Sequence, residues 1–353
     1  MSPAVRARLE RLLDAARAIQ NPGTPLGKEA RARLAITSGL SPAGIELALA
    51  EGLETHPTEA ELARLAAHVS SAPRAHVLLS ANVFTAAHRA IALALAASEQ
   101  VFVRPSRREP EMARLLARGA PGLFTVVAQL EPAPGDACFA YGSDATLSEL
   151  RAALAPGVRL YAHGSGYGLV VTEAAAVADP SARAALADAI ALDVTLFDQR
   201  GCLSPRGVLL EGDAALAEAL VPALAHAFVE LETRVPVGAI APEERAEQRR
   251  QRAALAVAGT VCPAGSGFVA RVSDAGVLET LPSGRCFGVV CVDDAAEIAR
   301  ALAPAITTCA VAGAPELRAR VAEALPTARL TVPGRLQRPP FDGPADLRPY
   351  LGG

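Results

Sequence analysis

The 353-residue chain contains no tryptophan, only 4% aromatic residues and a single lysine, Lys28. The shortage of aromatic rings argues against base-stacking platforms and aromatic cages. With one lysine, a Schiff-base or pyridoxal phosphate enzyme is not expected. The formal net charge of -3 provides no positive field that would attract a nucleic acid or an anionic membrane. We therefore expect a small-molecule substrate and no nucleic-acid or membrane partner.

Several sequence motifs of known chemistry are also missing. The chain has no GxxxxGK[ST], GxSxG or HExxH motif, and its six cysteines form no CxxC pair. We therefore expect neither a metal site nor a redox dithiol, and the unpaired thiols favour a cytoplasmic protein. Uninterrupted apolar runs such as residues 90–97 are far shorter than the roughly 20 residues that span a bilayer. The N-terminal residues lack the apolar core of a signal peptide.

The rest of the composition is that of an enzyme-sized folded protein, with 51% apolar and 20% charged residues. Residues 1–71 place apolar side chains at helical spacing and predict a helical lead-in. Beyond them, short β-rich runs alternate with helical runs, which predicts an α/β fold with largely parallel sheets. We expect a nucleotide-binding domain over residues 1–172, a catalytic domain over 173–336 and an irregular surface tail over 337–353. The expected strands are residues 75–79, 101–103, 123–127, 137–140, 158–161, 207–210, 267–272, 288–292, 308–311 and 329–332.

An asparagine follows the first expected strand. Asn82 stands between this strand and a helical run, at the sheet edge where parallel sheets bind ligands. Its side-chain amide is a candidate donor to a developing oxyanion. Asparagine is also a good helix N-cap, so the sequence leaves both interpretations open.

Two further strand ends carry candidate anion-binding groups. The strand at residues 101–103 runs into a basic turn with Arg104, Ser106 and Arg107, which could hold a ribose or a phosphate or could be a solvated turn. The strand at residues 137–140 leads to Gly142 and Ser143 at a helix start, where backbone N–H groups favour anions. The glycine-rich stretch 164–168 precedes an apolar run typical of a strand, so we interpret it as a connector and not as a dinucleotide-binding loop.

Cys202 differs from the other cysteines in its surroundings. It follows Gly201 in a segment without helical or strand pattern, where backbone amides can approach its sulfur and favour a reactive thiol. Four other cysteines lie inside apolar strand patterns and are expected to be buried and inert: Cys138, Cys286, Cys291 and Cys309.

In their order along the chain, these motifs resemble those of the aldehyde dehydrogenase superfamily. Asn82 lies in a segment similar to the asparagine motif, and Cys202 in one similar to the cysteine motif. Between them, Arg104-Pro105-Ser106 resembles the Lys-Pro-Ser/Ala motif and Tyr141-Gly142-Ser143 the Gly-Ser motif. The strongest resemblance within the superfamily is to acyl-CoA reductases of the bacterial bioluminescence fatty-acid reductase type. It is carried by Asp198-Gln199 before Cys202, residues 333–337 and Asp342-Gly343.

The resemblance covers about residues 70–350 and implies an aldehyde-dehydrogenase-like fold with two Rossmann-like α/β lobes. Hydrolytic members carry a glutamate that activates water, whereas the corresponding stretch here is residues 162–165. Without this base a thiol such as coenzyme A becomes the natural acyl donor or acceptor. His163 in this stretch is a candidate replacement acid or base, although a lone histidine is more often structural.

The cofactor expectation rests on the basic turn. Arg104 replaces the family lysine that contacts the adenosine ribose, and Arg107 stands where many NAD-preferring members carry an acidic residue. A guanidinium removes the repulsion toward a 2'-phosphate and offers it a bidentate partner, so we expect NADPH, with NAD less favoured.

The resemblance thus implies NADPH-dependent reduction of an acyl-CoA thioester to an aldehyde. Cys202 would form the enzyme thioester, while the Asn82 amide and the Cys202 backbone N–H stabilise the oxyanion. Three alternatives remain open: aldehyde oxidation, reduction of an acyl phosphate, and a non-catalytic relative that serves as an interaction module. The chain is short for the superfamily before Ala75. We therefore expect the arm that usually builds dimers to be missing, which leaves the oligomeric state open.

Overall fold

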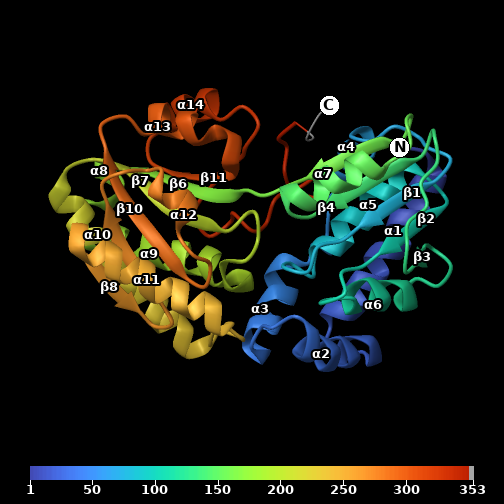
Figure 1. Cartoon of the computed structure of the whole chain (residues 1–353), viewed down its shortest axis with the longest axis horizontal. Coiled ribbons are helices and arrows are strands. Elements are labelled where there is room, and N and C mark those ends of the chain that lie inside the picture. Colours follow the sequence, from blue (N-terminus) through green and yellow to red (C-terminus); the bar gives the residue numbers. More distant parts are fainter. Residues whose placement is uncertain (350–353) are drawn as a thin grey trace. The chain divides into compact units, whose positions relative to one another are not determined.

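The computed structural model describes residues 1–349 and divides into two compact units. One unit contains Met1–Ser165 and Pro340–Ala345, and the other contains Gly166–Pro339 and Asp346–Arg348 (Figure 1). The chain passes from one unit to the other before strand β6 (Tyr167–Glu173), because β6 pairs with two strands of the second sheet. Residues 167–172, which we expected in the first domain, therefore form most of a strand of the second sheet.

The first unit opens with the expected helical lead-in. Three of its helices begin at a proline that follows a hydroxyl residue, and in each case the hydroxyl accepts a hydrogen bond from a backbone N–H of the first turn. Proline fits this first position because its missing N–H would have no partner inside the helix. The helices are α1 (Pro3–Gln20), α2 (Pro25–Thr37), α3 (Pro42–Gly52) and α4 (Glu59–Ala67).

A five-stranded parallel sheet forms the core of the first unit, in the order β3-β2-β1-β4-β5. This is the order of a mononucleotide-binding half of a Rossmann fold, which reverses direction between β1 and β4. Its strands are β1 (Ala75–Leu78), β2 (Val101–Arg104), β3 (Thr125–Val126), β4 (Ala137–Tyr141) and β5 (Arg159–His163). Its helices are α5 (Ala86–Ala97), α6 (Glu111–Gly119) and α7 (Asp144–Ala153).

The reversal of strand order distributes these helices over both faces of the sheet. Right-handed crossovers in opposite directions place α5 and α7 on opposite faces. On the α7 face, Leu147 packs against Ala140 and Ala162 of β4 and β5, with Leu78 beside them. Helix α7 thus covers the β4 and β5 side of this face.

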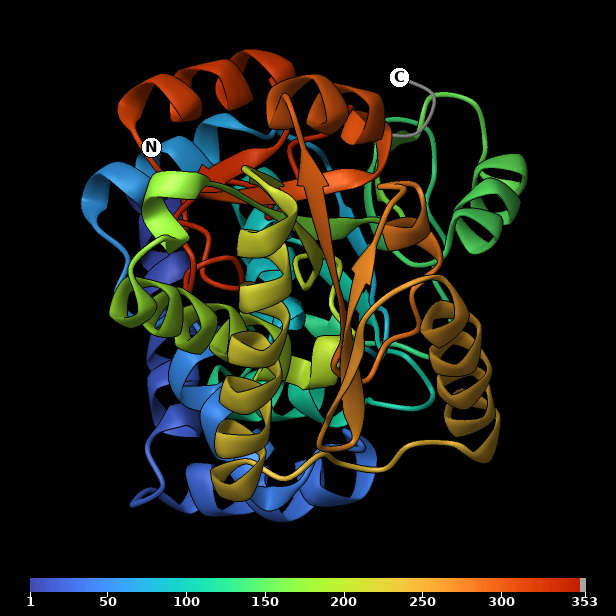
Figure 2. The same cartoon turned by 90° about the vertical axis from the view of Figure 1, so that its left-hand side faces the viewer.

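The second unit contains a seven-stranded sheet in the order β12-β11-β6-β7-β10-β9-β8. All neighbours are parallel except β8 and β9. Helices α9 and α10 lie side by side on one face, whereas α13 and α14 cover the other (Figures 1 and 2). The other strands are β7 (Pro205–Glu211), β8 (Val261–Ala264), β9 (Gly267–Val272), β10 (Cys286–Val292), β11 (Ile306–Ala312) and β12 (Arg329–Thr331). The helices are α8 (Ala174–Val177), α9 (Pro180–Thr195), η1 (Leu196–Gln199), α10 (Ala214–Arg234), α11 (Pro242–Ala258), α12 (Val277–Thr280), α13 (Ala295–Leu302), η2 (Ala303–Ala305) and α14 (Pro315–Ala324).

Helix α10 is long and apolar enough to cross a membrane by length and composition, although charged and polar residues interrupt its apolar sequence. In the structure it packs against α9 and the second sheet. Its side chains Leu220, Leu224 and Phe228 are buried in the hydrophobic core on that face of the sheet. Core helices of globular proteins meet the same test, so this feature is explained by the fold.

The C-terminal tail has no helix or strand from residue 337 to 349, as expected. The expectation that it lies on the surface is wrong for several of its residues. In the first unit, the buried Arg89 guanidinium donates to the Pro340 and Gly343 carbonyls, at 2.7 Å each, and the Phe341 ring stacks on His88. These contacts satisfy the tail's backbone without regular structure. Its buried side chains include Gln337, Phe341 and Asp346.

Candidate active site

Cys202 lies in the turn between η1 and β7 and is an exposed residue. The expected burial holds for Cys138, Cys286 and Cys309, whereas Cys291 is only half-buried because it stands near the end of β10. Cys202 is thus accessible to a substrate, while the strand cysteines are shielded to different degrees.

The environment of Cys202 favours the protonated thiol. Surrounding protein atoms desolvate the sulfur and raise its pKa to about 11, although solvent reaches the residue. Asp346 raises this pKa further, whereas Arg348 and the residue's own backbone N–H lower it. The backbone amides that we expected to favour the thiolate therefore have only a minor effect on the pKa of Cys202. Attack by this thiol requires removal of its proton.

The backbone around Cys202 is held by side chains from distant segments. The Thr307 hydroxyl of β11 donates to the Cys202 carbonyl at 2.5 Å. The Ser204 hydroxyl accepts from the Gly201 N–H at 3.2 Å and from the Gln337 side-chain amide at 2.6 Å. These bonds fix the turn on both sides of the sulfur.

Three residues before this turn adopt left-handed backbone conformations. Phe197, Asp198 and Gln199 have φ values of 56°, 50° and 61°. Such a conformation costs a non-glycine residue on the order of 1–3 kcal/mol and persists only where surrounding contacts hold it. The Asp198 carboxylate accepts from the Arg285 guanidinium at 2.7 Å and from the Gly238 N–H at 2.9 Å. Asp198 and Arg285 are both buried.

The side chain of Gln199 provides the second anchor of this segment. Its amide N–H group donates to the Pro205 and Cys286 carbonyls at 2.8 and 2.7 Å, and its carbonyl accepts from the Cys286 N–H at 2.9 Å. Gln199 therefore joins the turn to β7 and β10. The Asp-Gln pair that precedes Cys202 thus acts on the backbone that carries the thiol.

The segment 333–337 is fixed in a similar way by Asp193 of α9. The buried Asp193 carboxylate accepts from the Gly334 and Leu336 N–H groups at 2.6 and 3.0 Å. Burial raises the pKa of Asp193 to about 7, while these N–H donors lower it. Gln337, which follows directly, reaches Ser204 beside Cys202.

Asn82 lies in an exposed bend after β1. Helix α5 has Thr85 at its N-cap position and no side-chain capping bond, so the alternative that Asn82 caps this helix is wrong. Asn82 belongs to the first unit and Cys202 to the second. Their meeting in one oxyanion site stays a prediction.

His163 ends β5, and its ring stacks on Tyr141 at the end of β4, with 4.8 Å between ring centroids. The side chain is buried within the first unit. This packing is a structural role, and a role as acid or base stays a prediction.

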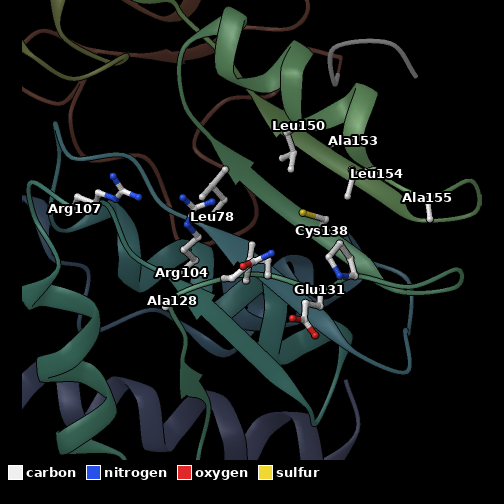
Figure 3. A pocket seen from close by; sticks show the side chains of 13 residues that line it. Leu78, Arg104, Arg107, Ala128, Glu131, Cys138, Leu150, Ala153, Leu154 and Ala155 are labelled. Atoms are coloured by element: carbon white, nitrogen blue, oxygen red, sulfur yellow. The ribbon is translucent and has the colours of Figure 1, made fainter.

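A cavity of about 490 Å³ opens at the carboxyl ends of β1 and β2 in the first unit (Figure 3). Arg104 and Arg107 line it, together with Leu78 and the loop 128–132. In Figure 3, Arg107 lies on one side of the lining and Glu131 on the other. The remaining lining residues are Cys138, Leu150, Ala153, Leu154 and Ala155. The cavity thus combines apolar side chains with two guanidinium groups, one carboxylate and the Gln129 amide.

Three other candidate cofactor residues are not among those that line this cavity. The Ser106 hydroxyl accepts from the Arg108 N–H at 3.2 Å. Ser143 caps α7, where its hydroxyl accepts from the Thr146 N–H at 3.3 Å, and Gly142 precedes it. Contact of these residues with a cofactor stays a prediction.

Comparison with known proteins identifies the family. The LuxC acyl-CoA reductase family matches residues 125–343, which is more than half of the chain. The protein belongs to the LuxC acyl-CoA reductase family. It is therefore an oxidoreductase of acyl-CoA and aldehyde chemistry, and the alternative of a non-catalytic interaction module is wrong. No curated protein sequence matches the chain.

Solved structures show that this LuxC-family reductase has the aldehyde dehydrogenase fold. A lactaldehyde dehydrogenase from Escherichia coli is 15% identical with a TM-score of 0.68 and matches 94% of this chain and 79% of its own. An NAD-dependent benzaldehyde dehydrogenase from Corynebacterium glutamicum is 17% identical with a TM-score of 0.67, over 94% and 81%. A propionaldehyde dehydrogenase from Clostridium phytofermentans is 14% identical with a TM-score of 0.62, over 95% and 84%.

Several residues around the candidate sites of the LuxC-family reductase were not found from the sequence. Arg285 stands between Gly284 and the apolar strand β10, and a charged residue at such a strand start is a signal for a buried ion pair. Glu131 lies in a loop without a strand or helix pattern, and Thr307 resembles any strand threonine, so neither gave a signal. Within the described residues, no group of three or more His, Cys, Asp or Glu side chains could hold a metal ion.

Proposed function

We propose that this LuxC-family protein reduces the thioester of an acyl-CoA to the aldehyde, with NADPH as reductant and Cys202 as the acyl acceptor. The observation that carries the proposal is the position of Cys202, an exposed residue in a turn fixed by Thr307, Gln199 and Ser204. A fixed and accessible sulfur supports nucleophilic attack, because a reacting atom must be presented in a defined position.

In the first step, the Cys202 sulfur attacks the thioester carbonyl and coenzyme A leaves as a thiol. The Asn82 side-chain amide and the Cys202 backbone N–H are the proposed oxyanion donors. The raised pKa of Cys202 means that a base must accept the thiol proton, and His163 is the candidate for this role. When bound, the nicotinamide cofactor would supply the hydride that converts the enzyme thioester to the aldehyde.

The cavity in the first unit supports binding of NADPH. Arg104 and Arg107 offer two guanidinium groups to the ribose and to the 2'-phosphate, and the apolar lining suits an adenine ring. The Glu131 carboxylate would repel a phosphate, but Figure 3 shows it on the side of the lining away from Arg107. Gly142, Ser143 and Ser106 remain proposed contacts of the same cofactor.

The protein is proposed to act in the cytoplasm as an enzyme of small-molecule metabolism. All six cysteines are free thiols, which fits a reducing compartment.

The proposed activity is tested by following NADPH oxidation and aldehyde formation with acyl-CoA substrates of several chain lengths. The expected result is aldehyde formation with acyl-CoA, and none with the variant Cys202→Ala. Reactions with an acyl phosphate, and with an aldehyde plus NADP⁺, are run beside it. Activity with the acyl phosphate and none with acyl-CoA would replace the proposal by an acyl-phosphate reductase.

A further inference from the structure

The C-terminal tail returns to the second unit at Asp346–Arg348, beside the turn that carries Cys202. We propose that Asp346 and Arg348 are positioning residues that together set how readily the Cys202 thiol becomes a nucleophile. This inference rests on the proposed function of Cys202 and assigns a role to a part of the chain outside the sequence motifs.

The two side chains form a well-defined ion pair. The Arg348 Nε and Nη2 atoms donate to the two carboxylate oxygens of Asp346 at 3.0 and 2.9 Å. The third nitrogen, Nη1, donates to the Pro304 carbonyl at 2.8 Å. Their side chains are only 13% and 6% exposed. Such a partly desolvated bidentate pair keeps the guanidinium in one orientation.

The pair is packed into the structure that holds Cys202. A Cβ atom added to Gly166 would lie 2.7 Å from Arg348 Nη2 and 2.6 Å from Thr307 Cγ2, so both side chains lie against this glycine. The Thr307 hydroxyl in turn donates to the Cys202 carbonyl at 2.5 Å. Arg348, Gly166, Thr307 and the Cys202 backbone thus form one continuous cluster.

The two charges act on Cys202 in opposite directions. The Asp346 carboxylate raises the pKa of the thiol, and the Arg348 guanidinium lowers it. Because the carboxylate is bound directly to the guanidinium, each charge limits the effect of the other. Removal of one charge should therefore leave the other acting alone on the sulfur.

The inference is tested by the pH dependence of Cys202 alkylation by iodoacetamide, located by peptide mass spectrometry in the full-length protein. A shift of half a pKa unit changes the thiolate fraction below the pKa by about threefold. We expect Asp346→Asn to accelerate alkylation at pH 8 by about threefold or more, and Arg348→Gln to slow it by a similar factor. Arg348→Lys keeps the positive charge and should restore a rate near that of the wild type.

A matched control is Arg320→Gln, which removes a half-exposed ion pair with Glu211 and Asp294. It should leave the alkylation profile unchanged. Melting temperatures identify variants that fail to fold. If Arg348→Gln fails to fold, Asp346→Asn alone tests the inference. Unchanged rates, or shifts of both variants in the same direction, would overturn the inference. The outcome is independent of the proposed function, which fails instead if acyl-CoA leaves wild-type Cys202 unmodified.

Discussion

At the scale of single residues, the proposed reaction depends on the side-chain amide of Asn82 and the thiol of Cys202. The two residues differ in the number of contacts that hold them in place. Cys202 is embedded in a network of bonds to its backbone, whereas Asn82 lies in an exposed bend and does not cap α5. A substitution of Asn82 therefore removes no helix cap, and its effect should report on catalysis.

The variant Asn82→Ala is expected to lower kcat by roughly 100- to 1000-fold, because loss of one oxyanion donor costs about 3 kcal/mol. The affinity for NADPH should change little. Steady-state kinetics with an acyl-CoA and calorimetry with NADPH measure the two quantities. Asn82→Asp, which keeps the size of the side chain but replaces the donor, should be at least as impaired. A kcat within a few-fold of the wild type would remove Asn82 from the oxyanion site.

Cofactor choice is a second property of single residues. The variant Arg107→Glu is expected to weaken NADPH binding by about tenfold or more, because the carboxylate repels the 2'-phosphate where a guanidinium attracted it. NADH binding should change less. The exposed neighbour Arg108 is not among the residues that line the cavity, so Arg108→Glu is the matched control. If calorimetry found that Arg107→Glu weakens the binding of NADPH and NADH equally, Arg107 would not bind the 2'-phosphate.

At the scale of elements, the segment before Cys202 combines backbone strain with a buried ion pair. The variant Asp198→Ala removes the nearer carboxylate partner of the buried Arg285 guanidinium and leaves only Glu232, at 3.5 Å. Breaking such a pair costs about 3–5 kcal/mol, so a large loss of unfolding free energy is expected in urea titrations. The exposed pair Arg6 and Glu10 provides a comparison, because solvent screens this pair and Glu10→Ala should change the unfolding free energy far less. Equal effects of the two variants would contradict the role assigned to Asp198.

The contribution of the contact between α9 and the segment 333–337 to the free energy of unfolding should depend on pH. The pKa of Asp193 is raised by burial to about 7 from an unfolded value near 3.8. The folded state therefore binds more protons between these values, and stability falls as the pH rises from about 4 to 7, by at most about 1.4 kcal/mol per unit. Asp193→Asn removes this contribution. Urea titrations at several pH values should show a stability difference, wild type minus variant, that decreases across this range. A constant difference would contradict the raised pKa.

Element positions were largely predictable where the hydrophobic pattern was strong. The strand expected at 267–272 occurs as β9, and most other expected strands occur with shifted ends. Strand β8 was missed because it contains Pro263, which removes a backbone donor and is tolerated only at an edge such as this one. The expected strand 123–127 shrinks to the short edge strand β3.

The contacts that define the Cys202 turn could not be predicted from the sequence. Asp198 and Arg285 are 87 positions apart, and Cys202 and Thr307 are 105 positions apart. Such contacts depend on the order of strands in the sheet, which hydrophobic periodicity does not specify. The motif order nevertheless identified Cys202, since the resemblance rested on a set of residues in sequence and not on their packing.

At the scale of the whole molecule, the sequence predicted two α/β units but not the path of the chain between them. Strand β6 begins at Tyr167, inside the glycine-rich stretch 164–168 that we expected to be a connector, and enters the second sheet. The tail contributes Pro340–Ala345 to the first unit and Asp346–Arg348 to the second. The proline- and glycine-rich composition of the tail indicated an irregular segment. This composition did not indicate that two backbone carbonyls of the tail accept hydrogen bonds from the buried Arg89.

The proposed reaction requires that the acyl group is transferred to Cys202 before it is reduced. The most direct measurement is intact-protein and peptide mass spectrometry after incubation with an acyl-CoA in the absence of NADPH. We expect one acyl group, located on Cys202, released as aldehyde when NADPH is added, and absent from Cys202→Ala. An acyl group on another residue, or turnover without any acyl-enzyme, would contradict the account.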